Sequence, residues 1–132
     1  MSSSVFSVTS VANYSCLPNS DLISGWTEAN SGVTVSRSYE DHRNLLTQVR
    51  NMAGTNLISR FDYANDAIGR RTQRIDSGAS AATNAFGYNP RSELTNAVMG
   101  ANSFGYQYDP IGNRISSISG GTAASPSVYT AN

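Results

Sequence analysis

The chain has 132 residues, nine acidic and nine basic side chains, and a formal net charge of zero. This balance argues against a nucleic-acid-binding protein, because such proteins need clustered positive charge. Cys16 is the only cysteine, which excludes an internal disulfide and a cysteine-based metal cluster.

The composition also bears on location and on the thickness of the fold. No apolar run approaches the roughly 18 residues that a membrane-spanning helix needs. Residues 1–6 lack the basic and apolar blocks of a signal peptide, so the chain as given shows no export signal. Charged residues make up 14% of the chain, and tyrosine, with seven copies, is the main bulky residue. We therefore predict a thin sheet whose faces carry tyrosine rings.

Six marker residues recur along the chain at steps of roughly 20 to 26 residues, which is the range of a repeat array. The marker residues are Cys16, Tyr39, Asn65, Tyr88, Tyr108 and Tyr129. A second column lies two positions earlier, at Tyr14, Arg37, Tyr63, Phe86, Tyr106 and Ser127. Spacing by two places both columns on one face of an extended strand.

Each marker residue except the last is followed by a sequence typical of a tight turn. In the best copy, Asp109, Pro110 and Gly112 occupy the positions that a type I turn prefers. The Asp side chain can bond amides two residues on, and the Gly can take the positive φ of a bulged hairpin loop. Partial copies are found at Asp66 and Gly69, at Pro18 and at Pro90.

A second strand is predicted after each turn, so that each repeat is a hairpin. The second strands are expected at Leu22–Ser24, Leu45–Val49, Arg71–Ile75, Leu94–Val98 and Arg114–Ile118. Return loops rich in Gly, Ser, Ala and Asn are expected at Ala29–Gly32, Met52–Asn56, Ser77–Thr83, Met99–Asn102 and Ser119–Pro126. The predicted fold is all-β: tandem β-hairpin repeats that form a curved antiparallel sheet.

We predict one array of about five hairpins over residues 1–132. The array is expected to be incomplete at its C-terminal end, because Tyr129 stands where a sixth turn should start. A repeat array needs caps, and neither end resembles one. We therefore expect the chain to be a fragment of a larger protein.

Two groups of residues could act in ligand binding or in catalysis, and each also has a structural interpretation. The tyrosine columns could be a platform for glycans, but rings aligned on neighbouring strands are expected to pack on one another. Asp66 and Asp109 could be general acids or metal ligands. Such chemistry needs carboxylates that converge on one point, whereas these two occupy equivalent turns, and we predict that they cap those turns.

Two further groups complete the candidates. His42 and Cys16 have the residue types of a base and a nucleophile, but the marker position of Cys16 predicts a buried, inert thiol. In the basic stretch, strand spacing places Arg70 and Arg74 on one face and Arg71 on the other, which indicates solvated charge with local pairing. We therefore assign no catalytic, cofactor-binding or metal-binding residue and predict that the chain is not an enzyme.

The recurring pattern Tyr-x-Tyr-Asp-x-x-Gly-Asn/Arg-Arg resembles the YD repeats of the rearrangement-hotspot (Rhs) family. Its best copy is residues 106–114, and its second is residues 61–71. The residues that carry the signature are Tyr39, Tyr63, Asp66, Gly69, Tyr88, Pro90, Tyr106, Tyr108, Asp109, Pro110, Gly112, Arg114 and Tyr129. Nearly the whole chain is covered.

The resemblance implies a ribbon of hairpins that coils into a hollow shell, of which this chain would form a section. In that family the shell holds a C-terminal toxin or effector, or presents a surface for adhesion and glycan contact. The expected function is therefore non-catalytic and structural; the alternative is a cell-surface adhesion or carbohydrate-binding module. The implied partners are the remaining repeats, an enclosed effector domain and, for the alternative, a glycan. The parent protein is expected to be bacterial and secreted or at the cell surface.

Overall fold

The computed structural model describes residues 11–120 and 127–128, and these form strands and turns with no helix. The predicted all-β fold is confirmed. The chain divides into two compact units, Met1–Arg60 and Phe61–Asn132, which we treat separately. The marker residue Tyr129 lies outside the described residues.

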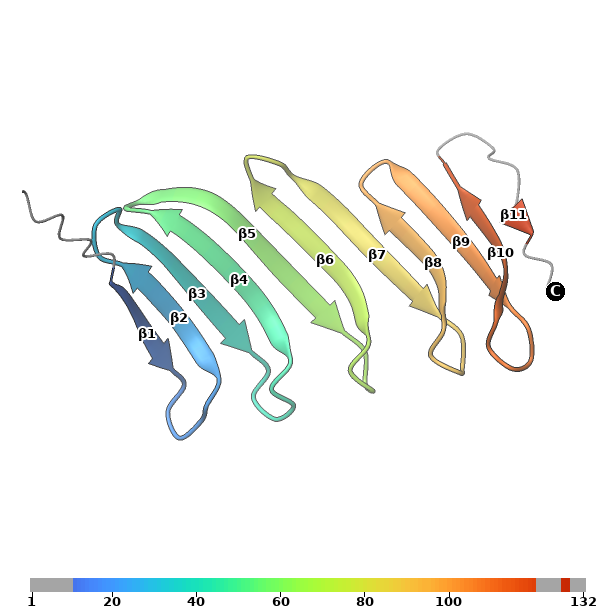
Figure 1. Ribbon diagram of the computed structural model, residues 1–132, viewed down its shortest axis with the longest axis horizontal. Helices are drawn as coiled ribbons and strands as arrows, with labels where there is room; N and C mark the ends of the chain where they lie inside the picture. The colour runs from blue at the N-terminus through green and yellow to red at the C-terminus, as the bar shows by residue number, and fades with distance from the viewer. Residues whose placement is uncertain (1–10, 121–126, 129–132) are drawn as a thin grey trace, which may run out of the picture. The chain divides into compact units, whose positions relative to one another are not determined.

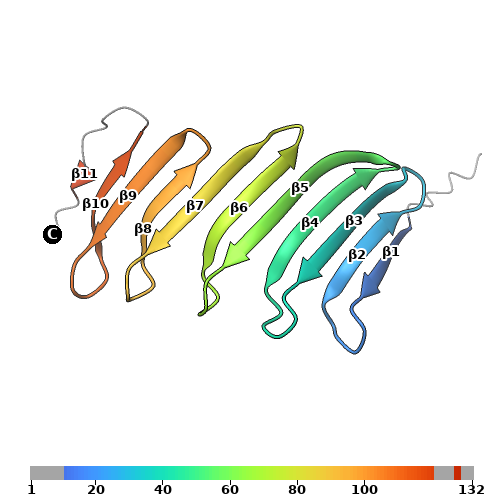
Figure 2. The same ribbon diagram turned by 180° about the vertical axis from the view of Figure 1, so that it is seen from behind.

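Unit 1 contains two hairpins in chain order (Figure 1). Their strands are β1 (Ala12–Cys16), β2 (Ile23–Glu28), β3 (Val33–Tyr39) and β4 (Leu46–Ala53). Each strand pairs antiparallel with the next, and the β2–β3 pairing joins the two hairpins. The tight turns after β1 and β3 lie at one end of this sheet, and the return loop after β2 lies at the other (Figures 1 and 2).

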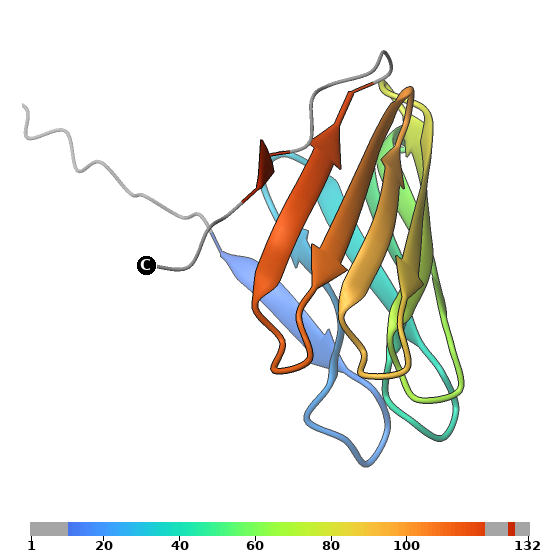
Figure 3. The same cartoon turned by 90° about the vertical axis from the view of Figure 1, so that its right-hand side faces the viewer.

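Unit 2 continues the pattern. Strand β5 (Asn56–Asn65) begins in unit 1 and ends in unit 2. It is followed by β6 (Arg71–Gly78), β7 (Ala82–Tyr88), β8 (Leu94–Met99), β9 (Asn102–Tyr108), β10 (Arg114–Ser119) and β11 (Ser127–Val128). From β6 onward each strand pairs antiparallel with the next. The turns after β7 and β9 lie at the same end of the sheet, as the side view in Figure 3 shows.

A bulge follows the tight turn in four hairpins. Tyr39 pairs with Leu46 while Ser38 pairs with Gln48, so Thr47 is skipped in the register. The other skipped residues are Ser24, Thr95 and Ile115. A bulge of this kind increases the local twist of the hairpin. The bulged loop predicted from the Gly at the fourth turn position is confirmed at Gly112, where φ is +95°.

Three return loops are shorter than predicted, among them the loop at residues 99–102, because Met99 ends β8 and Asn102 begins β9. Residues 52–56 were expected to form a loop, but Met52 and Ala53 still pair with β3, and β5 begins at Asn56. The chain reverses only at Gly54, where φ is +57°. Similarly, β6 continues to Gly78 and β7 begins at Ala82. The predicted loop at residues 119–126 falls largely outside the described residues. Composition alone misplaced these boundaries because small and polar residues also occur in strands that are only partly buried.

Very little of either unit is buried. Of the described side chains, Ala97 and Asn84 are the most enclosed, each about 3% exposed. The Asn84 amide donates to the carbonyl of Arg74 and to the carboxylate of Asp76, so this buried polar group is satisfied. Stability must therefore come mainly from bonds between neighbouring strands and turns, since a thick apolar core is absent from the described residues.

Candidate functional site

The tight turns of unit 2 share one hydrogen-bond pattern. In each, the side-chain oxygen of the residue after the marker accepts the backbone N–H groups two and four residues on. The acceptors and donors are Asp66 with Ile68 and Arg70, Asn89 with Arg91 and Glu93, and Asp109 with Ile111 and Asn113, at 2.8–3.1 Å. The prediction that Asp66 and Asp109 cap their turns is confirmed.

The second polar atom of each capping side chain is also bound. Asp66 Oδ2 accepts from Arg70 Nε at 2.6 Å, and Asp109 Oδ2 accepts from the Asn113 amide at 2.9 Å. The hydrogen bond from Asn113 holds the pKa of Asp109 below its usual value. At Asp66 partial burial would raise the pKa, but the bonds and charge of Arg70 outweigh it and lower the pKa. Both carboxyls are thus stabilised as structural anions.

Two arginines link successive turns of unit 2. Arg70 Nη1 donates to the carbonyl of Asn89 at 3.1 Å, and Arg91 Nη2 donates to the carbonyl of Asp109 at 2.7 Å. Arg91 also donates to the carbonyl of Pro110 and pairs with Glu93. Hydrogen bonds with a charged partner are stronger than neutral ones. The turns therefore form one connected row.

A tyrosine hydroxyl links each hairpin to the one before it at three joints. Tyr39 donates to the carbonyl of Ile23 at 2.9 Å. The equivalent bonds run from Tyr88 to Arg71 at 2.9 Å and from Tyr108 to Leu94 at 2.8 Å. Each acceptor is the first residue of the preceding hairpin's second strand. The marker tyrosines thus satisfy carbonyls at the turn end of the sheet.

These carbonyls lie outside the segment in which the backbones of neighbouring hairpins pair. The register between β8 and β9 begins at the pair Asn96 and Gly105, two residues after Leu94. Between β6 and β7 it begins at the pair Gln73 and Ala85. The tyrosine hydroxyl thus supplies a hydrogen bond where the strands have separated, which explains why the marker position favours Tyr over Phe.

Among the described residues, two rings of the second column contact arginines, and one contacts another ring. The Arg71 guanidinium lies 3.8 Å from the centroid of Tyr63, and that of Arg114 lies 5.7 Å from Tyr106. Both distances suit cation–π interaction. The predicted ring-on-ring packing is found, among the described residues, between Tyr14 and Trp26, whose centroids are 6.5 Å apart.

One prediction for the basic stretch is wrong. Arg71 was expected on the face opposite Arg74, yet Arg71 lies over Tyr63 and Arg74 lies over Phe61. These two rings are two residues apart on β5 and therefore share a face. Simple alternation along β6 therefore does not hold between Arg71 and Arg74. The predicted local pairing is confirmed by the ion pairs of Arg70 with Asp66 and of Arg74 with Asp76.

The prediction for Cys16 is also wrong, because the thiol is exposed and not buried. Strand β1 pairs with β2, and all five residues of β1 are exposed. Among the described residues no hairpin precedes β1, whereas the half-buried markers Tyr39, Tyr88 and Tyr108 each follow one. His42 lies in the exposed turn after β3.

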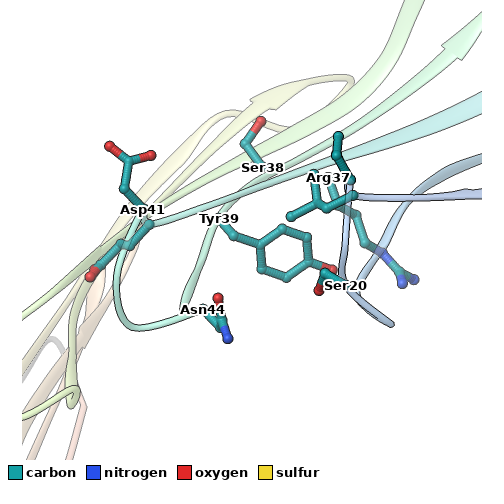
Figure 4. A pocket seen from close by; sticks show the side chains of 9 residues that line it. Ser20, Arg37, Ser38, Tyr39, Asp41 and Asn44 are labelled. Carbon is teal, nitrogen blue, oxygen red and sulfur yellow. The ribbon is translucent and has the colours of Figure 1, made fainter.

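A hollowed surface lies in unit 1, around Tyr39. A depression of about 460 Å³ lies between the turn after β1 and the turn after β3. It is lined by Leu17, Pro18, Ser20, Arg37, Ser38, Tyr39, Glu40, Asp41 and Asn44. Figure 4 looks onto the Tyr39 ring, with Ser20 and Asn44 beside it. An adjoining hollow is lined by residues 39–43.

Sequence reasoning missed this depression. A signal was present, since the turns after Cys16 and Tyr39 lack the capping Asp or Asn of unit 2. No cluster of three or more His, Cys, Asp or Glu side chains that could hold a metal ion occurs in residues 11–120 and 127–128. The same residues contain no helix that is long and apolar enough to cross a membrane.

Comparison with known proteins adds no identification. The sequence matches no model of a protein family, and it matches none of the curated proteins.

Proposed function

We propose that this chain is a non-catalytic, structural section of an Rhs/YD-type repeat shell that encloses or presents another domain. The observation that carries the proposal is the tyrosine bond at three joints between hairpins. Because the same tyrosine of the repeat makes this bond each time, each of these hairpins pairs with the preceding hairpin in the same register. A sheet assembled in this way can be extended without a growing core, as a wall requires.

The use of the polar side chains supports the same function. The carboxylates of Asp66 and Asp109, which could have served as acids or metal ligands, are occupied in capping turns. The arginines of the basic stretch pair with carboxylates or stack on rings. A structural role accounts for these residues, whereas catalysis would need groups that converge on a substrate.

The test is to express the chain together with its flanking coding sequence and to digest the product with protease at native pH. A shell predicts that a domain encoded downstream is protected until the repeat region is unfolded, and that electron microscopy shows a hollow particle. The matched control is the downstream domain expressed alone, which should be digested quickly. Equal digestion rates for the free and the attached domain would contradict the proposal.

A further inference from the structure

The depression beside Tyr39 is lined in part by polar side chains that have no hydrogen-bond partner among the described residues, whereas the capping side chains in the turns of unit 2 form hydrogen bonds within their own turn. The side chains of Arg37, Asp41 and Asn44 have no hydrogen-bond or ion-pair partner within the described part of the chain. The Ser20 hydroxyl accepts one bond, from the backbone N–H of Leu22, and keeps its own proton for another acceptor. In unit 2, by contrast, both polar atoms of Asp109 are bound within its turn.

The ring at the centre of the depression is held in place. The Tyr39 hydroxyl is committed to the carbonyl of Ile23 at 2.9 Å, so the hydroxyl fixes the ring and leaves the ring face for contact. Tyr39 lines the depression, and Figure 4 shows Ser20 near the hydroxyl end of the ring and Asn44 beside the ring. A fixed ring loses little conformational entropy when a ligand binds.

The charges around the ring favour an anion. Arg37 is half buried and is the cation of the lining that lacks an ion-pair partner in the described residues. The Glu40 carboxylate is bound by Arg43 at 2.7 Å. Asp41 is exposed, and its carboxylate points away from the Tyr39 ring (Figure 4). A ligand on the ring would therefore meet an uncompensated guanidinium from Arg37.

We propose that this depression binds a small compound with one six-membered ring and one carboxylate group. The ring lies on the face of Tyr39, and the carboxylate accepts hydrogen bonds from Arg37, the pairing that guanidinium groups favour. Asn44 and Ser20 supply further donors beside the ring. This site goes beyond the structural function proposed above and does not depend on it. Uronic acids and aromatic acids both have this chemistry.

The experiment titrates glucuronate, benzoate, glucose and acetate separately into the ¹⁵N-labelled chain and follows the amide resonances. Binding of glucuronate or benzoate is expected with a dissociation constant of about 1–10 mM, the range for so small a ligand. The shifts should centre on residues 37–44. Glucuronate without benzoate would identify a sugar acid, and the reverse would identify an aromatic acid. Binding of neither, or glucose or acetate binding equally well, would overturn the proposal.

Three variants test the assignment of roles. Arg37→Gln should weaken binding about tenfold, because the charged partner is lost. The matched control is Arg50→Gln, since Arg50 is exposed and lies on the opposite face of the sheet. Tyr39→Phe keeps the ring and should keep binding within about twofold, whatever it does to stability. Unchanged affinity in Arg37→Gln, with the fold intact by its amide spectrum, would overturn the proposal.

Discussion

The two units solve the same tight turn in different ways. In unit 2 the turns close from the residue after the marker to the residue four positions on, as between Asp109 and Asn113, and a side chain caps each turn. In unit 1 the turns after Cys16 and Tyr39 close five positions on, from Leu17 to Leu22 and from Glu40 to Leu45. One extra residue and the absence of a cap leave polar side chains unused.

A repeat of this kind needs a bond between neighbouring hairpins and a turn within each hairpin, and only the turn differs between the two units. The tyrosine bond between hairpins is the same in both units, from Tyr39 in unit 1 and from Tyr88 and Tyr108 in unit 2. The bond is kept at these three joints, while the turn beside it differs between the units. A turn that varies on a fixed frame is a common place for binding sites.

The largest expected effect is at a glycine of the joint in unit 1. A Cβ on Gly25 would lie 2.3 Å from the carbonyl oxygen of Val35 in the facing strand, which is far too close. Gly25→Ala should lower the free energy of unfolding by about 1–3 kcal/mol, because the two strands must move apart. Urea denaturation followed by fluorescence would measure it.

Unit 2 offers the matched control for that change. A Cβ on Gly105 would lie 3.9 Å from Ile118 Cβ, which is an ordinary contact. Gly105→Ala should therefore change stability by less than about 0.5 kcal/mol. If both substitutions cost the same, then the close approach of β2 and β3 does not govern the joint.

Removing one marker hydroxyl is expected to have an intermediate effect. Tyr88→Phe leaves the carbonyl of Arg71 without its partner and should destabilise the chain by about 1 kcal/mol. Tyr39→Phe should cost a similar amount in unit 1. The control is Tyr106→Phe, because the ring of Tyr106 contacts Arg114 and its hydroxyl has no hydrogen-bond partner in the described residues. Equal losses for Tyr88→Phe and Tyr106→Phe would show that the hydroxyl bond contributes nothing.

A smaller change, a gain in stability, is expected from a substitution in a turn of unit 2. Ser92 has a φ of +65° at the turn position where Gly69 and Gly112 occur. A residue with a Cβ is strained there, whereas Gly is not, although Gly costs more entropy on folding. Ser92→Gly should stabilise the chain by about 0.5 kcal/mol, seen as a higher urea midpoint. A lower midpoint would mean that the weak contact of the Ser92 hydroxyl with Arg70 outweighs the strain.

The smallest expected effect is a difference in acid sensitivity. The pKa values of Asp66 and Asp109 are lowered in the folded chain from 3.8. Their contribution to stability is therefore present above pH 3.8 and is lost as the pH falls through the lowered folded-state values. Amide exchange at Ile68 and Ile111 should accelerate below pH 3.8 beyond the intrinsic pH effect, and exchange at Asn19 should not. Asp109→Asn should abolish the extra acceleration at Ile111; its persistence would exclude this carboxyl as the cause.

Much of this architecture follows from the sequence because it is encoded locally and repeatedly. The strands need only alternating residues, and the turn needs only Pro, Asp and Gly at fixed offsets. These signals recur often enough to reveal the period of the repeat. The turn caps at Asp66 and Asp109 were predictable for the same reason, since both partners of each bond lie within four residues.

Other features depend on contacts between distant residues and required the tertiary structure. Arg71 lies over Tyr63 and Arg74 over Phe61, on one face, although alternation along the strand predicted opposite faces. Cys16 is exposed because no described hairpin packs beside β1. The hydroxyl bond of Tyr39 and the depression around it join segments 16 or more residues apart. Sequence determined the repeat because hydrogen bonds within a hairpin are short-range, whereas only the tertiary structure brings the two turns of unit 1 together around Tyr39.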